Sequence, residues 1–291
     1  MVALNGPAPR PPRPARPYRN EGRPVTLVLS TYRGLTQLSA PVLNQLLKRR
    51  IARGKEDPVR YWEKCAQQMA TRPDGPLLWC HGASVGEALS ILPLIDKLLA
   101  QNPALTILVT TTTVTSATLM AERLPARAVH QFAPLDHPRW VTRFLDHWQP
   151  DAALWLESEL WPNMLGQLRN RDVPAVLVNG RISDRSFARW QQFSGTARAL
   201  LGSFALCFGQ SDEDCARLRT LGAASVEGVG NIKFAAPPLP VDQEQQAALA
   251  DAIGNRPVWL AASTHPGEEE MILDCHRILT ATIPDILTVI A

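Results

Sequence analysis

Short apolar segments that alternate with helical segments constrain the fold of this chain more than any other feature. From residue 77 onward, apolar runs are separated by longer stretches in which apolar residues recur at helical spacing. This alternation predicts a parallel sheet that is covered by helices on both faces, an α/β fold. We expect strands at 77–80, 106–111, 128–132, 152–156, 175–178, 204–208 and 226–229. We expect helices near 87–100, 114–124, 139–147, 162–171, 186–201 and 212–221.

A proline-rich segment at 236–240 interrupts the alternation and predicts a linker over residues 236–242. The pattern then resumes, and we expect a helix near 243–253, a strand at 257–262, a helix near 268–280 and a strand at 286–291. Two strands in about fifty residues are too few to bury a core of their own. We therefore interpret residues 243–291 as the start of a second, truncated lobe.

The segment before the first predicted strand has two parts. Residues 1–24 contain seven prolines and five arginines against one acidic residue, which predicts a disordered basic arm. Within 25–76, an apolar stripe at helical spacing precedes the basic stretch 48–55, and this pattern predicts a membrane-associating helical segment. The alternative is a helix packed on its own domain, followed by a solvated basic stretch. The stripe consists of Leu35, Leu38, Val42 and Leu46.

Composition narrows the possible functions. The formal net charge of +3 is too small to indicate nucleic acid as a partner. The five cysteines are scattered and form no CxxC pair. This spacing is typical of a protein in a reducing compartment and does not indicate a zinc site.

Residues 212–214 read DED, a pattern that holds a metal and a diphosphate in some sugar transferases. Because they follow Ser211 at a predicted helix start, we expect them to cap the helix instead.

The loops after the strands hold the candidate functional residues, because ligands of such sheets bind beyond the carboxyl ends of the strands. The first of these loops, residues 81–87, reads HGASVGE and includes Ser84, Gly86 and Glu87. Glu87 stands at or near a helix start. Its carboxylate is expected either to cap that helix or to act as a general base toward a hydroxyl group.

Later loops add charged groups of both signs. In residues 157–163, ESELWPN, the side chains of Glu157 and Glu159 point to the same side if the chain is extended, or both stabilise the positive end of the next helix. Arg181 and Lys233 follow other strands. Two cations on one rim indicate an anionic ligand, although each residue can also be solvated or paired with an acid.

Six segments together resemble one family, the 3-deoxy-D-manno-octulosonic acid (Kdo) transferases of bacterial lipopolysaccharide synthesis. The resemblance covers residues 77–291, is loose over 25–76, and is not found in the first 24 residues. It implies a GT-B architecture of two Rossmann-like lobes, with an acceptor-binding lobe complete at 77–235 and a donor-binding lobe cut short. The segments are HGASVGE (81–87), ESELWPN (157–163), VNGRISDRS (178–186), GQSDED (209–214), GNIKF (230–234) and ASTHPGEEE (262–270).

The resemblance also implies a reaction. The family moves Kdo from CMP-Kdo to a glucosamine 6-hydroxyl of the lipid A precursor, with inversion. Glu87 then resembles the general base, and Glu157 and Lys233 resemble the pair that stabilises the transition state. No metal or other cofactor is expected, because the single phosphate of the donor is a poor chelator. The substrate-binding residues that this resemblance implies are Ser84, Gly86, Glu159, Asn163, Arg181, Ser211 and His265.

The expected partners are the lipid A precursor, CMP-Kdo and the cytoplasmic face of the inner membrane, to which we expect peripheral or monotopic attachment. The family's PRHPER-like motif and glycine-rich donor segments do not follow the predicted strand at 286–291, so we expect this chain alone to be inactive or impaired. Two alternatives are a non-catalytic module that binds the lipid A precursor, and a GT-B enzyme that uses another anionic sugar nucleotide.

Overall fold

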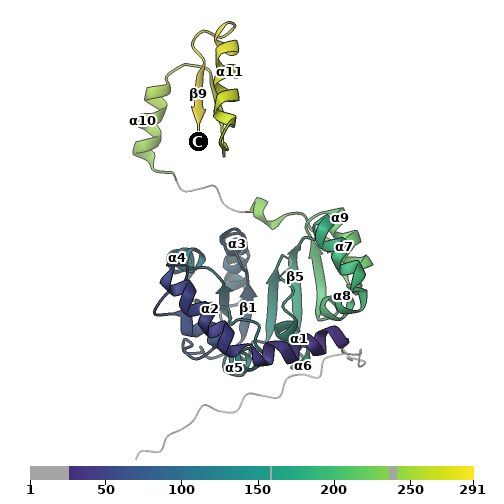
Figure 1. Ribbon diagram of the computed structural model, residues 1–291. Helices are drawn as coiled ribbons and strands as arrows, with labels where there is room; N and C mark the ends of the chain where they lie inside the picture. The colour runs from purple at the N-terminus through teal and green to yellow at the C-terminus, as the bar shows by residue number, and fades with distance from the viewer. Residues whose placement is uncertain (1–25, 158, 236–240) are drawn as a thin grey trace, which may run out of the picture. The chain divides into compact units, whose positions relative to one another are not determined.

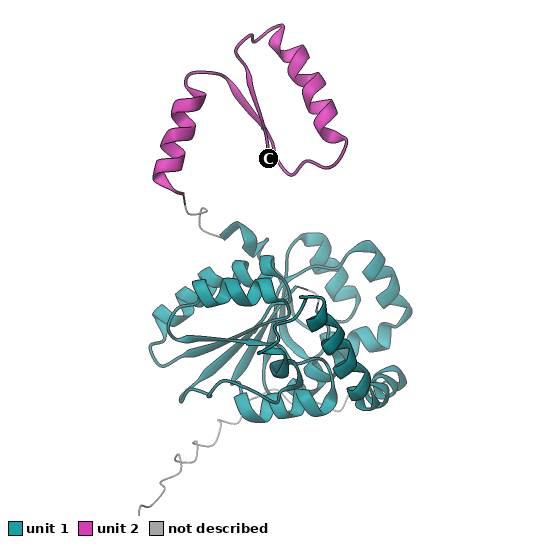
Figure 2. Ribbon diagram, turned by 60° about the vertical axis from the view of Figure 1, so that its left-hand side comes forward, with its two compact units in different colours: residues 1–236 teal, residues 237–291 magenta. Residues whose placement is uncertain are grey.

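The structure, a computed structural model, describes residues 26–157, 159–235 and 241–291. These residues form two compact units, 26–235 and 241–291, which Figure 2 colours separately. The basic arm predicted at 1–24 and residues 236–240 of the predicted linker lie outside the described residues. Each unit is considered by itself.

The first unit contains a sheet of seven parallel strands in the order β3-β2-β1-β4-β5-β6-β7 (Figure 1). The strand order reverses between β1 and β4, which pair directly and place His81 opposite Trp155. Ligands of such sheets bind at this reversal. The strands are β1 (Leu77–His81), β2 (Thr106–Thr111), β3 (Ala128–Phe132), β4 (Ala152–Leu156), β5 (Ala175–Gly180), β6 (Phe204–Gly209) and β7 (Val226–Gly228).

Helices cover both faces of this sheet and bury two apolar cores. On one face, Ile91 and Met120 of the helices pack with Cys80 of the sheet. On the other face, Phe144 and other helix residues pack with Trp79. Burial on both faces explains why the strands are apolar runs and not alternating patterns. The helices are α3 (Val85–Gln101), α4 (Val114–Arg123), α5 (Pro138–Trp148), α6 (Pro162–Asn170), α7 (Asp184–Gln192), α8 (Ser194–Leu201) and α9 (Asp212–Thr220).

The single helix that we expected near 186–201 is wrong, because the structure has two helices there, α7 and α8. Phe193 leaves the helical conformation with φ −117° and ψ 43°, and its N–H donates to the carbonyl of Trp190. Gly195, a weak helix former, lies in the first turn of α8. The break separates a helix without buried residues, α7, from α8, which buries Leu200 and Leu201.

The N-terminal part of the first unit begins with α1 (Leu27–Leu38) and α2 (Ala40–Ala52), which meet at Ser39 because Pro41 lies in the first turn of α2. Leu29 and Leu47 pack against the core of the unit. Leu35, Leu38, Val42 and Leu46, which we call the outer stripe, are 48% to 79% exposed. The helices therefore pack on their own domain and turn the predicted apolar stripe outward.

The second unit contains α10 (Gln243–Ile253), β8 (Val258–Ala261), α11 (Glu268–Thr280) and β9 (Leu287–Ile290) in the predicted order. The strands β8 and β9 pair in parallel, with Val258 opposite Leu287. None of residues 241–291 is buried. Two strands and two helices thus do not enclose a core, as expected for so short a segment. In the part of the chain that is described, no helix is both long and apolar enough to cross a membrane.

Candidate functional site

Three loops that are far apart in the sequence meet at the carboxyl edge of the sheet. Lys233 lies in the 3-10 helix η2 (Ile232–Ala235), and its Nζ donates to Oε1 of Glu157 at 2.7 Å. A methyl group added at Gly86 would lie 3.9 Å from the same Nζ, so the first turn of α3 lies against the lysine. The structure therefore brings together the loops that carry Gly86, Glu157 and Lys233.

Glu87 caps the helix in which it lies. Oε2 accepts the Ala83 N–H at 2.9 Å and Oε1 accepts the Ser84 hydroxyl at 2.7 Å, while the Glu87 N–H donates to the Ser84 hydroxyl at 3.3 Å. Ser84 is the N-cap of α3, and its own predicted contact with substrate stays a prediction. The capping interpretation of Glu87 is confirmed, and these hydrogen bonds fix its carboxylate in one place at the edge of the sheet.

The environment of Glu87 favours its protonated form. The residue is 5% exposed, and this burial raises the pKa of its carboxyl group. The hydrogen bonds from Ser84 and Ala83 lower the pKa, whereas the negative charges of Glu157 and Glu159 raise it further. A carboxylate whose pKa lies above its usual range is a better proton acceptor than an exposed one, provided that it is ionised at the working pH.

Two residues at this edge have left-handed backbone conformations. Glu157 has φ +53° and Asn179 has φ +57°, at the carboxyl ends of β4 and β5. Such conformations are unfavourable for residues with a Cβ, and neighbouring bonds hold them here. The Glu157 N–H donates to the Val178 carbonyl at 2.9 Å, and Oδ1 of Asn179 accepts the Ile232 N–H at 3.2 Å. Asn179 thereby fixes the start of η2, from which Lys233 extends.

The chain at Glu157 is not extended, which was the condition for predicting that the Glu157 and Glu159 side chains point to the same side. Because φ is positive at Glu157, the chain bends directly after β4. The two carboxylates then take different partners. Glu157 binds Lys233, and Oε2 of Glu159 accepts the Trp161 indole N–H at 2.6 Å.

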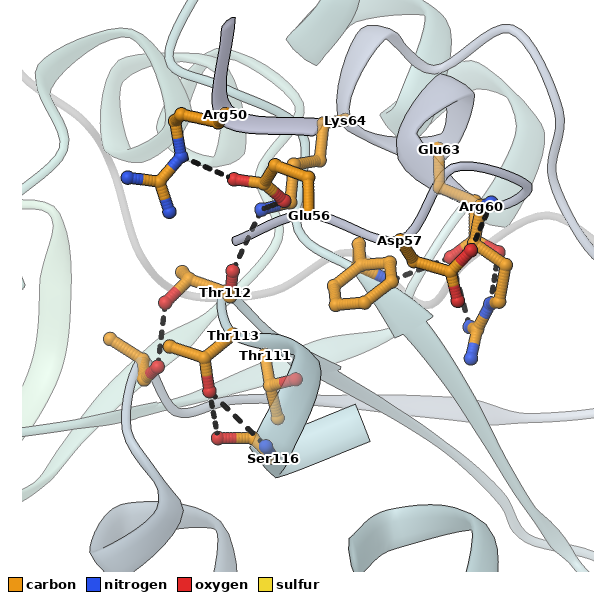
Figure 3. A network of polar contacts seen from close by, with 12 residues as sticks. Arg50, Glu56, Asp57, Arg60, Glu63, Lys64, Thr111, Thr112, Thr113 and Ser116 are labelled. Atoms are coloured by element: carbon orange, nitrogen blue, oxygen red, sulfur yellow. Dashed lines mark hydrogen bonds and ion pairs between the residues drawn. The ribbon is translucent and has the colours of Figure 1, made fainter. Parts of the chain in front are cut away.

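A buried network behind the Glu87 loop was not predicted from the sequence (Figure 3). Lys64 and Glu56 are both buried and form an ion pair, and Lys64 Nζ donates to the Thr112 carbonyl at 2.8 Å. The Thr112 hydroxyl donates in turn to the Ala83 carbonyl at 2.6 Å. Lys64 thus connects through Thr112 to the backbone that holds Glu87. Part of the predicted membrane segment therefore supports the site, and no local pattern around Lys64 indicates this.

His81 forms part of the floor under these loops. It is fully buried, its ring lies 4.3 Å from that of Trp155, and Nδ1 lies 2.9 Å from the Thr110 hydroxyl oxygen. Burial lowers the pKa of His81 to about 3, so the ring is neutral at physiological pH. A neutral histidine packed against Trp155 supports the packing of the site and carries no charge to a ligand.

Two predicted substrate-binding residues are instead committed to internal bonds. The Asn163 amide nitrogen donates to the Thr36 hydroxyl at 3.0 Å and thereby ties α6 to α1. Ser211 caps α9: its hydroxyl donates to Asp214 Oδ2 at 2.7 Å and accepts the Asp214 N–H. Asp214 also accepts the Ile182 N–H at 2.8 Å, so the DED triplet serves the helix start, as expected. The structure does not bring Asn163 or Ser211 to the carboxylates of the site.

Two other predicted residues remain open to solvent. Arg181 follows β5, is exposed, and pairs with no carboxylate among the described residues. His265 is exposed in the second unit, where its backbone N–H donates to Glu268 Oε2 at 2.9 Å. In the same described ranges, no three His, Cys, Asp or Glu side chains gather into a possible metal site.

Comparison with known families places the chain in one of them. The model of the family described as 3-deoxy-D-manno-octulosonic-acid transferase (kdotransferase) matches residues 47–236. The chain belongs to the Kdo transferase family. The matched region contains the first unit from Leu47, within α2, onward, and with it Lys64, the Glu87 loop, Glu157 and Lys233. The resemblance stated from the six sequence segments is thus confirmed.

Curated relatives of the same family extend the match. The chain is 35% identical to a 3-deoxy-D-manno-octulosonic acid transferase of Rickettsia bellii over 89% of its own length and 64% of the relative. It is 34% identical to a probable mitochondrial member of Arabidopsis thaliana, over 90% of the chain and 60% of the relative. A Haemophilus influenzae member is 33% identical over 78% of the chain and 55% of the relative. The chain thus spans less than two thirds of these Kdo transferases.

Solved structures with the same fold are more distant in sequence. The UDP-GlcNAc 2-epimerase of Neisseria meningitidis bound to UDP-GlcNAc has a TM-score of 0.55 at 16% identity, over 74% of this chain and 64% of that chain. A putative epimerase of Listeria monocytogenes has a TM-score of 0.54 at 12% identity, with 75% and 62% covered. These enzymes have the GT-B fold, so the predicted fold class of this Kdo transferase family member is confirmed.

Proposed function

We propose that this chain carries the acceptor-binding lobe and the catalytic carboxylate of an inverting glycosyltransferase that moves Kdo from CMP-Kdo to the lipid A precursor in lipopolysaccharide synthesis. The observation that carries the proposal is the position of Glu87. Its carboxylate has a raised pKa and is held at the carboxyl edge of the sheet, in the loop that also brings Gly86 against Lys233. A proton acceptor and a cation on one edge suit transfer of an anionic sugar to a hydroxyl group.

In the proposed reaction, Glu87 removes the proton from the glucosamine 6-hydroxyl as that oxygen forms a bond to the anomeric carbon of Kdo. The bond between this carbon and the CMP phosphate breaks on the opposite face, and its electron pair leaves with the phosphate. Attack opposite to the leaving group inverts the configuration. The Glu87 carboxylate accepts one hydrogen bond at each oxygen from Ala83 and Ser84, which leaves lone pairs for the acceptor hydroxyl.

Lys233 has the electrostatic role in this proposal. Its ammonium group stabilises negative charge that develops as CMP leaves, and Glu157 holds it in place through the 2.7 Å ion pair. The carboxylate of Kdo and the single phosphate of CMP make the donor anionic, which also suits the exposed Arg181. Because one phosphate is a poor chelator, the proposed reaction requires no metal ion.

Attachment to the cytoplasmic face of the inner membrane is the second part of the proposal. The outer stripe of α1 and α2 is exposed, and it precedes Lys48, Arg49, Arg53 and Lys55, which are exposed as well. Apolar side chains beside basic ones suit the headgroup layer of an anionic membrane, where each basic residue contributes about 1 kcal/mol. Such peripheral docking would place the site near an acceptor whose acyl chains remain in the bilayer.

The acceptor part of the proposal is tested by titrating the chain 1–291 with the deacylated glucosamine disaccharide bisphosphate, followed by NMR. Residues 26–76 are retained because Leu47 and Lys64 are buried in the first unit. We expect saturable shifts in the loops 81–87 and 157–161 that a Glu87→Gln/Glu157→Gln double variant loses. A folded chain that does not bind the disaccharide would contradict the acceptor assignment.

The donor part needs a transfer assay. CMP-Kdo-dependent transfer is measured in the chain itself and in a fusion that adds the segment of the Rickettsia bellii relative that the chain does not match. Transfer in the fusion, lost in its Glu87→Gln variant, would support the enzyme. Acceptor binding without any transfer in the fusion would favour a non-catalytic lipid-binding module.

A further inference from the structure

An apolar cavity of about 470 Å³ lies between α1, α6, α7 and α8. Its size falls within the range of about 300–1,000 Å³ that is typical of small-molecule sites. It lies apart from Glu87 and Lys233, neither of which lines it. Its apolar walls are formed chiefly by Leu29, Leu160, Trp190, Phe193 and Leu200.

The polar side chains that line this cavity are largely engaged elsewhere. The Tyr32 hydroxyl donates to Asp136 Oδ2 at 3.0 Å, and the Thr196 hydroxyl lies 3.2 Å from that of Thr26. A polar ligand inside the cavity would therefore find few partners for its own hydrogen bonds, which is unfavourable in an apolar site. The lining favours an apolar occupant.

The cavity opens beside the outer stripe. Val28 and Phe193 both line it and are both about half exposed, at 45% and 48%. Val28 and Leu35 are seven residues apart on α1, which places them on the same side of the helix. The exposed Arg189 also lines the cavity and pairs with no carboxylate in the described part of the chain. An apolar entrance beside the stripe is thus accompanied by a free cation.

The cavity also reaches the loop of the candidate catalytic pair. Leu160 and Pro162 line it, and Leu160 follows Glu159 in the loop that begins at Glu157. The backbone carbonyl of Glu159 accepts the indole N–H of Trp155, so this loop is tied to strand β4. An occupant of the cavity would therefore pack against the loop from which the carboxylates extend.

We propose that the cavity binds one acyl chain of the lipid acceptor, while Arg189 contacts an anionic or carbonyl group near the base of that chain. The inference rests on the proposed function, which supplies a lipid acceptor and a membrane surface beside the cavity entrance. Each methylene group that enters the cavity strengthens binding by about fourfold, so even part of a chain contributes. The chain would also orient the sugar headgroup relative to the Glu157 loop.

Two matched valine substitutions test this proposal. Val28→Trp places an indole at the cavity entrance, whereas Val42→Trp places the same group on the outer stripe, outside the cavity lining. The chain 1–291 and both variants are titrated with the deacylated disaccharide bisphosphate and with the same disaccharide carrying one acyl chain of medium length. Both probes are used as water-soluble monomers, so that adsorption to a membrane does not contribute.

We expect the chain to bind the acylated probe at least about tenfold more tightly than the deacylated one. Val28→Trp removes this preference and leaves the affinity for the deacylated probe unchanged, while Val42→Trp keeps the preference. Equal affinity of the chain for both probes, or equal effects of the two variants, would overturn the proposal. If only the acylated probe binds and Val28→Trp abolishes that binding, the acyl site stands and the proposed headgroup site fails.

Discussion

The ammonium group of Lys233 lies 2.7 Å from a carboxylate oxygen of Glu157, although 76 residues separate the two in the sequence. Glu157 follows β4 and Lys233 follows β7, and strands β5 and β6 lie between them in the sheet. The chain after β7 leads into η2, whose Ile232 N–H is bound by Asn179 at the end of β5. The ion pair is partly exposed, so it contributes only about 0–1 kcal/mol to stability. Its position beside the first turn of α3 is the one that the proposed role of Lys233 requires.

Replacement of Lys233 separates its contribution to stability from its proposed contribution to the reaction. We expect Lys233→Met to lower the transfer rate of the fusion by about 10²-fold or more, because the cation that stabilises the leaving phosphate is lost. The free energy of unfolding should change by less than about 1 kcal/mol. Transfer rates and urea unfolding measure the two effects. A large loss of stability with little loss of transfer would assign Lys233 a structural role.

Glu87→Gln should lower transfer by about 10²–10⁴-fold, because the amide cannot accept the acceptor's proton. The matched control is Asp214→Asn, since Asp214 also lies three residues after a serine that caps a helix. Both substitutions weaken a helix cap, by about 1 kcal/mol, and only the first removes the proposed base. Transfer assays and thermal unfolding of both variants make the comparison. Equal transfer rates in the two variants would refute the role of Glu87 as base.

The raised pKa of Glu87 predicts the direction of two pH effects. Since the folded state holds this proton more tightly than the unfolded state, Glu87 contributes stability below about pH 4.3, the ordinary pKa of glutamate. This contribution is lost as the pH rises through the higher pKa of the folded state. The free energies of unfolding of the chain and of Glu87→Gln, measured with urea across this pH window, should differ less as the pH rises. The proposed base role requires transfer to fall as the pH drops through the same folded-state pKa.

Thr112 should influence Glu87 without contacting it. The Thr112→Val substitution removes the hydrogen bond to the Ala83 carbonyl. The backbone of Ala83 is then held less firmly, and its N–H forms a weaker hydrogen bond to the Glu87 carboxylate. We expect the pKa of Glu87 to rise further, as measured by ¹³C NMR of its carboxyl carbon. The neighbouring Thr113→Val removes the cap of α4, which costs about 1 kcal/mol, and should leave that pKa unchanged. An unchanged pKa in Thr112→Val would show that the network only stabilises the fold.

Charged substitutions on the outer stripe test the proposed membrane attachment. Leu38→Asp and Val42→Asp should weaken binding to vesicles that contain anionic phospholipid by about tenfold or more, with little effect on unfolding. Leu47→Ala is the contrasting variant, because this leucine is buried and its truncation should cost about 2–5 kcal/mol. Vesicle co-sedimentation gives the affinities. Binding that withstands both aspartates would place the membrane contact elsewhere.

Much of the fold follows from the sequence pattern. Short apolar runs, separated by segments in which apolar residues recur at helical spacing, identified all the strands and most of the helices of both units. This pattern arises because strands that are buried on both faces are apolar throughout. The rule that parallel strands end at one edge then grouped the loops of Glu87, Glu157 and Lys233 before any contact was known. The six motifs indicated the family, which the family model confirmed.

Other features depend on contacts between residues far apart in the chain, which no local pattern records. The break at Phe193, the left-handed turn at Glu157 and the path from Lys64 through Thr112 to the Glu87 loop were not predicted. The apolar stripe of α1 and α2 was predicted, but only packing of the opposite side of these helices on the sheet domain decided that the stripe faces solvent. The sequence determined which segments form strands and helices and which residue types follow each strand. Tertiary packing decided which of those side chains meet, because a contact depends on the positions of both partners.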